Sequence, residues 1–552
     1  MAELILGPLL RHVDDEAATI WVETDAPCTV SVLSTEQRTF EIEGHHYALV
    51  AVQHLDPGES TGYAVAIDGE SVWPPPDYPY PTPCIKPVAS GEGVRFIFGS
   101  CRVSYPHEEP YVLHHTEHPE GQGIDALRTL ALRLIRDEER PPDCLLMLGD
   151  QIYADDLSPH MCEVTESDAH PADAPADQLA DYREYAAAYH EAWGEPLIRW
   201  LLSTVPVAMV FDDHEIHAQW KISRAWQEML NAQSWYERRI DSGLMAYWVY
   251  QHLGNLSCRE LDASPLYEAI LAADGDAGPI LSEQMRKADE QPGHSRWSYY
   301  RDLGDTRLLV VDSRAGRELD PPDRQMIHSG EWKWIVEHAA GDFDHLLLAS
   351  SLPFFLTPGL HYIEAWDAQL ADRGRTRLTR ALGEKIRQQA VMDHWASFQD
   401  SFRELCELLT AIAGGGHGEG TAPETIIMLS GDVHHCYLAE VDLPEGAGAS
   451  SRVWQAVCSG YRKDLALREK RAMLLGNSRV GELIARGLAR MAGVERSPLP
   501  WRIVHEPTYD NQVASLELRP DRAEIHVETT VGSDWRDPDL HTVFKRDLLS
   551  GE

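Results

Sequence analysis

Four stretches of the chain share one pattern, in which a short apolar run of strand length stops at polar residues. The four runs end at Gly99-Ser100-Cys101, at Gly149-Asp150, at Asp212-Asp213-His214 and at Gly431-Asp432-Val433-His434. Apolar runs without alternation indicate strands that are buried on both faces of a parallel sheet. Because the carboxyl ends of parallel strands meet at one edge of a sheet, where such sheets bind ligands, we expect these polar tips to lie together.

The first part of the chain follows a different pattern. Short runs rich in β-branched and aromatic residues, such as 19–24 and 47–52, are separated by turn signals. They predict a small N-terminal β-sandwich, fibronectin-III-like, over residues 1–73. Prolines crowd the next stretch and indicate an extended linker, which we place at residues 74–90. The remainder, residues 91–552, is expected to form a second domain.

In the second domain, helical periodicity alternates with the apolar runs. Residues 124–139 lie between the runs that end at Gly99 and Gly149, and residues 179–202 lead into the run before Asp212. Strands that alternate with helices in this way predict βαβ units and an α/β fold. The aromatic-rich stretch 225–253 reads as one long helix that belongs to the core.

Composition narrows the possible functions. The formal net charge of −41 would repel nucleic acid and an anionic membrane surface, so we expect neither as a partner. The nine cysteines form no CxxC pair, which suits a reducing compartment. No signal peptide, twin-arginine motif or membrane-spanning run is visible, so the expected location is the cytoplasm. The sequence does not indicate an oligomeric state.

The polar tips carry residue types that bind metals. Cys101, Asp150, Tyr153 and His434 combine a thiolate, a carboxylate, a phenolate and an imidazole, and this set suits a trivalent ion such as Fe(III). Each of these residues also has a plain structural interpretation, since a lone cysteine is usually a small buried hydrophobe and a tyrosine can simply pack. Their shared position at strand ends favours the metal hypothesis.

A second set contains only carboxylates. Asp213 and Asp432, with Asp155 and Asp156, form an oxygen set that suits Ca²⁺, Mg²⁺ or Mn²⁺. Asp150 is the natural bridge between two ions, which together could hold a phosphate and activate a water for attack.

Two further residues are candidates for catalytic roles. We expect His214 to give a proton to the departing oxygen and Arg102 to bind a phosphate oxygen. Arg102 could instead pair with a carboxylate. His217, His394 and His435 read as hydrogen-bonded structural histidines.

The four motifs, with Gln151-Ile152-Tyr153 after Asp150 and Glu215 after His214, resemble those of the PhoD-type alkaline phosphatases of the calcineurin-like metallophosphoesterase superfamily. The resemblance covers most of the chain. It implies a two-sheet α/β/β/α sandwich preceded by a small β-sandwich, and hydrolysis of phosphomonoesters or phosphodiesters at a binuclear or trinuclear site. It also implies Fe(3+) together with Ca(2+), with Mn, Mg or Zn as other possible ions.

Residue by residue, the resemblance implies that Cys101, Asp150, Tyr153 and His434 hold iron. It implies that Asp150, Asp213 and Asp432 face calcium, and that His214 is the proton donor. The chain departs from the family in lacking a twin-arginine signal, and from the wider superfamily at Ser350-Ser351, where a histidine often binds the second metal.

The expected partner is a small or polymeric phosphate ester. Two alternatives stay open at this point: a phosphoester-binding protein without turnover on the same fold, and a binuclear hydrolase of non-phosphate esters or amides.

Overall fold

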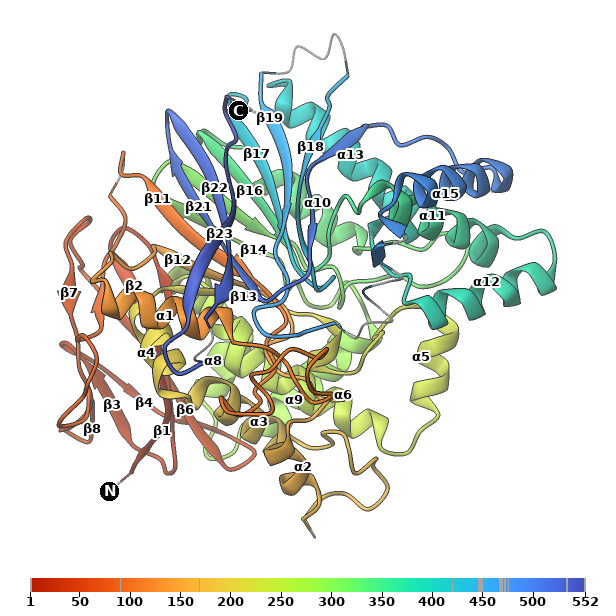
Figure 1. Cartoon of the computed structure of the whole chain (residues 1–552). Coiled ribbons are helices and arrows are strands. Elements are labelled where there is room, and N and C mark those ends of the chain that lie inside the picture. The colour runs from red at the N-terminus through yellow and green to blue at the C-terminus, as the bar shows by residue number, and fades with distance from the viewer. Residues whose placement is uncertain are drawn as a thin grey trace.

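The computed structural model describes residues 2–550 except 90, 168, 419, 445–449, 466–469, 471–472, 475 and 533–534. Two β-sheets pack face to face at the centre, helices cover their outer faces, and a strand-rich N-terminal region lies to one side (Figure 1). This is the predicted two-sheet α/β/β/α sandwich.

The first central sheet has six strands and carries three of the four motifs. Its order is β13 (Val207–Val210), β12 (Cys144–Leu148), β11 (Val94–Gly99), β21 (Gln512–Arg519), β22 (Arg522–Val531) and β23 (Asp539–Asp547). Strands β11, β12 and β13 run parallel, whereas β21 pairs with β11 in the antiparallel direction. The three motif strands therefore end at the same edge, as their sequence pattern predicts.

The second central sheet has seven strands and carries the fourth motif. Its order is β14 (Tyr299–Leu303), β15 (Thr306–Val310), β16 (His345–Ser350), β17 (Thr425–Ser430), β19 (Arg452–Val457), β18 (Cys436–Val441) and β20 (Trp501–Thr508). Strands β15, β16, β17 and β19 are parallel. The carboxyl ends of β15, β16 and β17 therefore lie at the same edge of this sheet.

One apolar layer joins the two sheets. Phe96 and Leu146 of the first sheet and Leu347 and Ile427 of the second belong to a single cluster of fully buried side chains. Burying both sheet faces against each other stabilises the centre at about 25 cal/mol for each Å² of apolar surface removed from water. The close packing fixes the two sets of strand ends relative to one another.

Helices cover the outer face of each sheet. On the first sheet and around it lie α1 (Ala126–Arg136), α2 (Pro159–Thr165), α3 (Tyr182–Gly194), α4 (Pro196–Thr204), α5 (Arg224–Asn231), α6 (Tyr236–Ala246), α7 (Cys258–Asp262), α8 (Pro265–Leu271) and α9 (Gly278–Glu290). On the second sheet and around it lie α10 (Ser329–His338), α11 (Pro358–Arg373), α12 (Arg377–Ala390), α13 (Gln399–Ala413) and α15 (Arg479–Ala492). Helix α11 contacts both α12 and α15, and the three form a lobe at the right of Figure 1.

The aromatic stretch 225–253 is not the single helix that its composition predicts. The chain leaves helix α5 at Asn231 and begins α6 at Tyr236, and α6 continues into a π-helical segment, η2 (Tyr247–His252), and a 3-10 turn, η3 (Leu253–Asn255). The break falls on a polar stretch that includes Asn231 and Ser234, residues that favour turns over helix interiors. The π-helix is buried throughout, as expected for core.

The N-terminal region is built from two four-stranded sheets. One has the order β1 (Leu4–Val13), β2 (Ala17–Thr24), β6 (His45–Gln53), β5 (Phe40–Ile42), and the other β4 (Thr35–Arg38), β3 (Thr29–Val32), β8 (Val65–Ile67), β9 (Glu70–Trp73). A cluster of buried side chains from both sheets, including Ile20, Val30 and Val65, fills the space between them. The alternating strand pattern of the sequence thus does produce a sandwich.

The proline-rich stretch after Trp73 stays attached to this sandwich. Strand β10 (Cys84–Ile85) pairs with β7 (Thr61–Gly62), and the side chain of Ile85 is fully buried. The segment that we predicted as a linker therefore returns to the N-terminal region before the chain enters β11.

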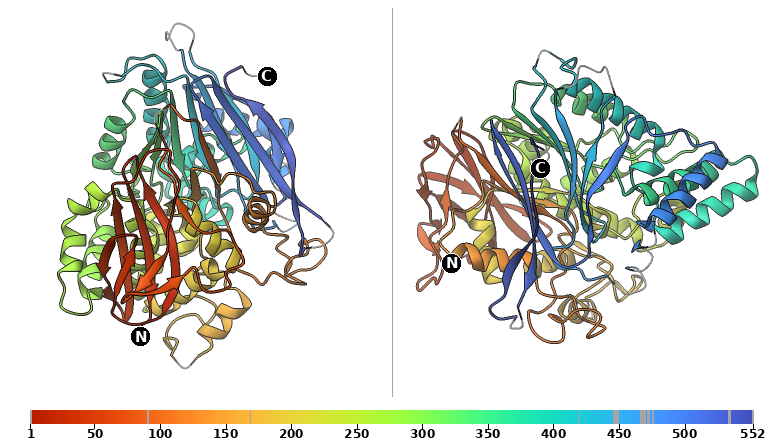
Figure 2. Two further views of the ribbon diagram at one scale, coloured as in Figure 1. Left: turned by 90° about the vertical axis from the view of Figure 1, so that its left-hand side faces the viewer. Right: turned by 45° about the horizontal axis from the view of Figure 1, so that its top comes forward.

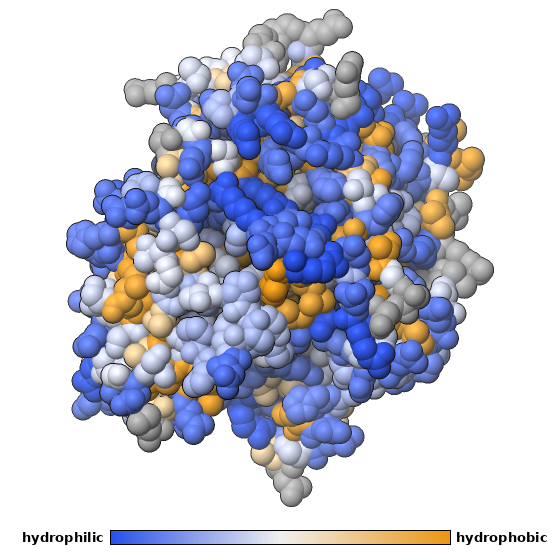
Figure 3. Space-filling view, turned by 60° about the vertical axis from the view of Figure 1, so that its left-hand side comes forward, coloured by the Kyte–Doolittle hydropathy of each residue, from blue (hydrophilic) through white to orange (hydrophobic). Residues whose placement is uncertain are grey.

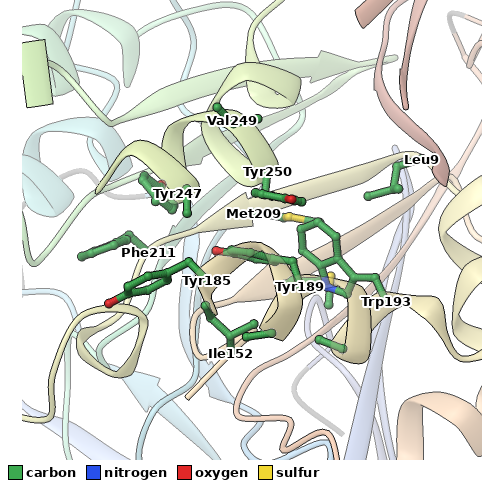
Figure 4. Packing of buried hydrophobic residues seen from close by; sticks show 14 of the residues in the cluster. Leu9, Ile152, Tyr185, Tyr189, Trp193, Met209, Phe211, Tyr247, Val249 and Tyr250 are labelled. Atoms are coloured by element: carbon green, nitrogen blue, oxygen red, sulfur yellow. The ribbon is translucent and has the colours of Figure 1, made fainter. Parts of the chain in front are cut away.

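A buried aromatic cluster joins the N-terminal sheet to the second domain. Leu9 of β1 lies near Trp193 of α3 and Tyr250 of η2, and Tyr189 stacks on Tyr250 with ring centroids 4.3 Å apart (Figure 4). The two views of Figure 2 show the N-terminal strands held against the helices that carry these residues. The junction is therefore part of the hydrophobic core rather than a contact between two surfaces.

The face of the molecule drawn in Figure 3 is largely hydrophilic. Figure 3 shows charged and polar side chains over most of one face, with hydrophobic patches that are small and separate. Within the described part of the chain, no helix has both the length and the apolar character needed to cross a bilayer.

Candidate metal centre at the strand ends

The motif residues meet where the two sheets come together. Cys101 follows β11, Asp150 follows β12, Asp213 begins the 3-10 turn η1 (Asp213–Glu215) after β13, and Asp432 follows β17. The backbone hydrogen bonds across this region include Cys101 N–H to Gly149 O at 3.2 Å, and the Asp432 N–H donates to Ser100 Oγ at 3.0 Å. Two sheets thus contribute to one site.

The backbone is strained at four of these positions. Cys101, Asp150, Asp432 and His434 have φ values of 57°, 55°, 63° and 50°, in the left-handed region that non-glycine residues rarely adopt. Such conformations cost about 1–3 kcal/mol each and concentrate at functional sites. Next to them, Gly149 has φ of 96° and leaves room for Asp212, whose Cβ would lie 2.5 Å from a Cβ added at Gly149.

A first group of donor atoms matches the predicted thiolate set. One ligand atom each of Cys101, Asp150 and His434 lies within 4.8 Å of the others. Cys101 Sγ is 3.3 Å from Asp150 Oδ2, and the Tyr153 hydroxyl donates to the same oxygen at 3.2 Å. All four predicted iron ligands therefore converge on one point.

A second group contains three carboxylates. Ligand atoms of Asp150, Asp212 and Asp432 lie within 4.8 Å of one another. Asp150 belongs to both groups, as expected for a bridging carboxylate. Asp150 Oδ1 and Asp212 Oδ2 are buried and have no hydrogen-bond partner among the described residues. Buried carboxylate oxygens are almost always paired, so these two orphan oxygens, set among further carboxylates, fit positively charged ligands.

The second group includes Asp212 where the sequence interpretation chose Asp213. Asp213 Oδ2 accepts the Gln219 N–H, and its Oδ1 lies 3.4 Å from Arg314 Nη2. Asp213 is thus beside the carboxylate group and shares a partner with Asp432, whose Oδ1 is also 3.4 Å from Arg314 Nη2. The structure places both Asp212 and Asp213 at the site.

The electrostatics reflect crowded negative charge. Burial raises the pKa of Asp150 to about 6, His214 opposes this shift, and the carboxylates of Asp213 and Asp432 add to it. Burial raises the pKa of the Cys101 thiol well above its usual range, and the nearby carboxylates of Asp150 and Asp432 add to this shift. A bound cation reverses both effects, because it stabilises carboxylate and thiolate and deprotonates a coordinating thiol.

His214 lies beside Tyr153 and is held by a carboxylate. Its Nδ1 is 2.7 Å from Asp155 Oδ1, and its ring centroid is 4.6 Å from that of Tyr153. Burial alone would lower the pKa of His214, but the carboxylates of Asp155 and Asp150 raise it well above its ordinary value. Asp155 is therefore a partner of His214 rather than a member of either donor group.

The predicted phosphate ligand Arg102 points elsewhere. Its Nε donates to Asp125 Oδ2 at 2.8 Å and its Nη1 to the Ala192 carbonyl at 2.7 Å, and the side chain is buried. The alternative interpretation, in which Arg102 pairs with a carboxylate, describes its position. Lys463 is a cation next to the site, because its Nζ lies 4.6 Å from the centre of the Tyr153 ring and bonds Asp156.

The structure adds residues to which the sequence assigned no role at the site. Arg314, after β15, is buried and makes ion pairs with Asp212, Asp393 and, at longer range, Asp432. The run 307–311 before it ends in a polar tip like the four motifs, and this signal could have identified it.

His394 is also at the site, although its sequence context reads as structural. Its Nδ1 is 2.8 Å from Glu364 Oε1, and its Nε2 is 3.3 Å from Asp432 Oδ2. It lies just before the short 3-10 turn η4 (Trp395–Ser397), and no local pattern marks it.

Glu215 holds two loops of the site through hydrogen bonds. Its carboxylate accepts the backbone N–H groups of Asp150 at 3.1 Å, Gln151 at 2.9 Å and Asp212 at 3.0 Å, and the Gln251 amide at 3.0 Å. Burial, with Asp150 nearby, raises the pKa of Glu215 to about 8. One side chain thus fixes the loops that carry both Asp150 and Asp212.

Two sets of metal-ligand side chains that share a carboxylate, at the carboxyl ends of strands in a two-sheet sandwich, are an arrangement suited to a metal-dependent hydrolase. The comparisons with known proteins give the family. A model described as PhoD-like phosphatase matches residues 121–464, which is more than half of the chain, and the chain belongs to that family. It is a metal-dependent phosphoesterase. A second model, described as a domain of unknown function (DUF7800), matches residues 1–85.

One solved structure supports the fold. The structure of PhoD aligns over 99% of this chain and 91% of that chain, with a TM-score of 0.59 and 12% sequence identity. The structure of the purple acid phosphatase PPD1 from yellow lupin (Lupinus luteus) seeds aligns over 98% of this chain and 73% of that one, with a TM-score of 0.48 and 12% identity. No curated protein matches the sequence.

Proposed function

We propose that the protein hydrolyses phosphate esters at a mixed-metal centre, with an iron ion in the thiolate group and a calcium-type ion in the carboxylate group. The observation that carries this proposal is that the two groups share Asp150 and contain the orphan oxygens Asp150 Oδ1 and Asp212 Oδ2. The family membership supports phosphate esters as substrates.

The iron assignment rests on donor chemistry. Cys101, Tyr153, Asp150 and His434 offer a thiolate, a phenolate, a carboxylate and an imidazole. Anionic sulfur and oxygen donors together favour a trivalent ion over calcium or magnesium, which take oxygen ligands only. The carboxylates of Asp150, Asp212 and Asp432, with Asp213 beside them, form an oxygen-only set that suits calcium.

When bound, the ions supply Lewis acidity toward the phosphate and an activated water. The chain's own residues then do the rest. His214, oriented by Asp155 through Nδ1, can give a proton from its other ring nitrogen to the leaving oxygen. Lys463 offers a positive charge beside Tyr153 for an anionic substrate. Arg314 and Glu215 keep the carboxylates in place.

A panel of substrates tests this function. Metal-loaded protein should hydrolyse aryl phosphomonoesters or bis-aryl phosphodiesters, and inorganic phosphate should compete. Carboxylic esters and amides serve as controls for a non-phosphate hydrolase. Absence of turnover on every phosphate ester, with both metals present by analysis, contradicts the proposal and favours a binding protein.

We expect the protein as isolated to contain iron and to be coloured. A phenolate or thiolate bound to Fe(III) absorbs visible light, and the Tyr153 hydroxyl and Cys101 Sγ both lie against Asp150 Oδ2. Tyr153→Phe should bleach or shift the band while the fold, monitored by circular dichroism, stays the same. Tyr105→Phe is the matched control, because that hydroxyl bonds the Leu157 carbonyl instead. Fully active protein that is colourless and free of iron contradicts the assignment.

We expect a calcium chelator to abolish turnover and added calcium to restore it. Asp432→Asn should weaken the apparent calcium affinity by about tenfold or more, since ligand charge tunes calcium affinity over several orders of magnitude. The measurement is a calcium titration of the rate after chelation, and the control is Asp442→Asn at an exposed site. Unchanged turnover in protein shown to hold no divalent ion speaks against an oxygen-bound ion.

A further inference from the structure

A third cluster of metal-ligand side chains lies away from the strand ends. It consists of Glu23 near the end of β2, His45 at the start of β6 and His190 in helix α3. The first two belong to the N-terminal sandwich and the third to the second domain. His190 follows Tyr189, which Figure 4 shows packed under Tyr250 at the same junction.

The three side chains converge on one point. Glu23 Oε1 is 2.8 Å from His45 Nδ1, and Glu23 Oε2 is 2.8 Å from His190 Nε2. One donor atom from each residue lies within 4.8 Å of the others, the same spacing that marks the two groups at the strand ends. Zinc binds imidazole nitrogen and carboxylate oxygen at about 2.0–2.2 Å, so only small side-chain shifts would place all three donors around one ion.

Among the described residues, the carboxylate at the centre of this cluster has no permanently charged partner. The Glu23 side chain is 1% exposed, and within the described residues its ion-pair partners are the two histidines, with no lysine or arginine among them. The backbone N–H of Glu43 donates to Asp276 Oδ1, and the Glu43 carboxyl is close enough to His45 to interact with it electrostatically, which adds negative charge near the cluster. A buried carboxylate is costly unless it is paired, and a divalent ion between the imidazoles supplies that pairing.

Tyrosine hydroxyls hold the carboxylate of this cluster in place, and its two histidines are partly exposed to solvent. The Tyr250 hydroxyl donates to Glu23 Oε2 at 2.9 Å, and the hydroxyls of Tyr47 and Tyr182 continue the network behind it. Partners of this kind orient metal-ligating side chains. The imidazoles of His45 and His190 are 23% and 31% exposed, so water and ions reach the cluster from outside.

We propose that Glu23, His45 and His190 bind a zinc ion that ties the N-terminal sandwich to helix α3, independently of the catalytic centre. Two imidazoles and one carboxylate are a ligand set typical of zinc, with water in the fourth position. Because the ligands come from both parts of the chain, the ion is a cross-link that stabilises the junction. The site rests on none of the residues proposed for catalysis.

The test separates zinc binding from a simple hydrogen-bonded cluster. His190→Gln and His45→Asn each keep an amide N–H near the position of the imidazole nitrogen, so each retains a hydrogen bond to Glu23 but removes a zinc ligand. Protein preloaded with iron and calcium is dialysed against zinc and analysed for bound metal. Wild-type protein should hold one more zinc per chain than either junction variant, and zinc should raise the melting temperature of the wild type but not of these two variants.

The control is His118→Gln, at a partly exposed histidine whose Nδ1 lies 3.9 Å from Glu120 outside any cluster. It should bind as much zinc as the wild type. Phosphatase activity reports that the catalytic centre is intact in every variant, and it should stay near the wild-type value. Equal zinc content in wild type and in both junction variants, or an equal loss in His118→Gln, overturns the proposal. If one junction variant fails to fold, the other decides.

Discussion

Asp150→Asn should nearly abolish hydrolysis and deplete both metals. Asp150 is the one residue that belongs to both donor groups, and its Oδ2 also receives the Cys101 and Tyr153 contacts. Metal ions contribute several kcal/mol of transition-state stabilisation. Since about 1.4 kcal/mol corresponds to a factor of ten, we expect kcat to fall by about 10³-fold or more. The measurement is kcat for an aryl phosphate together with iron and calcium content of the same sample.

The control is Asp156→Asn, six residues along the same loop. That carboxylate is 46% exposed and pairs with Lys463, outside both donor groups. Its loss should leave the metal content unchanged. Asp150→Asn protein with wild-type metal content and a rate within a few fold of normal would show that the shared-carboxylate arrangement is wrong.

His214→Ala should slow the hydrolysis of esters with poor leaving groups far more than of those with good ones. Its ring lies beside Tyr153, is held by Asp155, and belongs to neither donor group. An alkoxide needs a proton as it departs, whereas a nitrophenolate barely does. General acid catalysis is typically worth about 10²–10⁴-fold, so we expect a loss in that range for alkyl phosphates and a clearly smaller one for p-nitrophenyl phosphate.

The measurement is kcat/KM over a series of leaving groups, with metal analysis on the same protein. His217→Ala is the matched control, because that imidazole bonds the Ala218 carbonyl through Nδ1 and lies in the same loop. It should show no dependence on the leaving group. If His214→Ala loses the same factor for every ester and one metal is missing, His214 is a ligand and not a proton donor.

Several parts of the site could be predicted from sequence because they depend on local pattern and on a general rule. An apolar run that stops at Gly-Asp or Ser-Cys places the polar residue at a strand end, and parallel strands bring those ends together. Cys101, Asp150, Tyr153, Asp432 and His434 are found together for this reason. The two-sheet sandwich followed from the resemblance of the same motifs.

Other parts depended on contacts that no local pattern records. Asp212 and Asp213 are neighbours in sequence, and only the turn η1 decides that Asp212 joins the carboxylate group. Arg102 looked suitable for phosphate because of its neighbour Cys101, yet Asp125, the N-cap of α1, holds its guanidinium. His394 reaches Asp432 from a distant helical region.

The broken helix in the stretch 225–253 shows a limit of periodicity. The segment 247–252 is buried on every side, which leaves no polar face from which the helical register could be followed, whereas Trp226 and Trp235 earlier in the stretch are only half-buried. The π-helix at Tyr247–His252 shifts the ring of Tyr250 into contact with Tyr189 and Trp21, where tertiary packing outweighs the local preference for an α-helix.

The aromatic junction limits how independently the N-terminal region and the second domain can be exchanged. Two regions matched by separate family models, residues 1–85 and 121–464, suggest modules that could be exchanged between proteins. Yet Leu9 and Trp21 of the first region share one core with Trp193 and Tyr250 of the second. Replacing either region alone would leave large aromatic faces without their partners. The two regions therefore share one core, in which a substitution on one side of the junction constrains the residues that pack on the other.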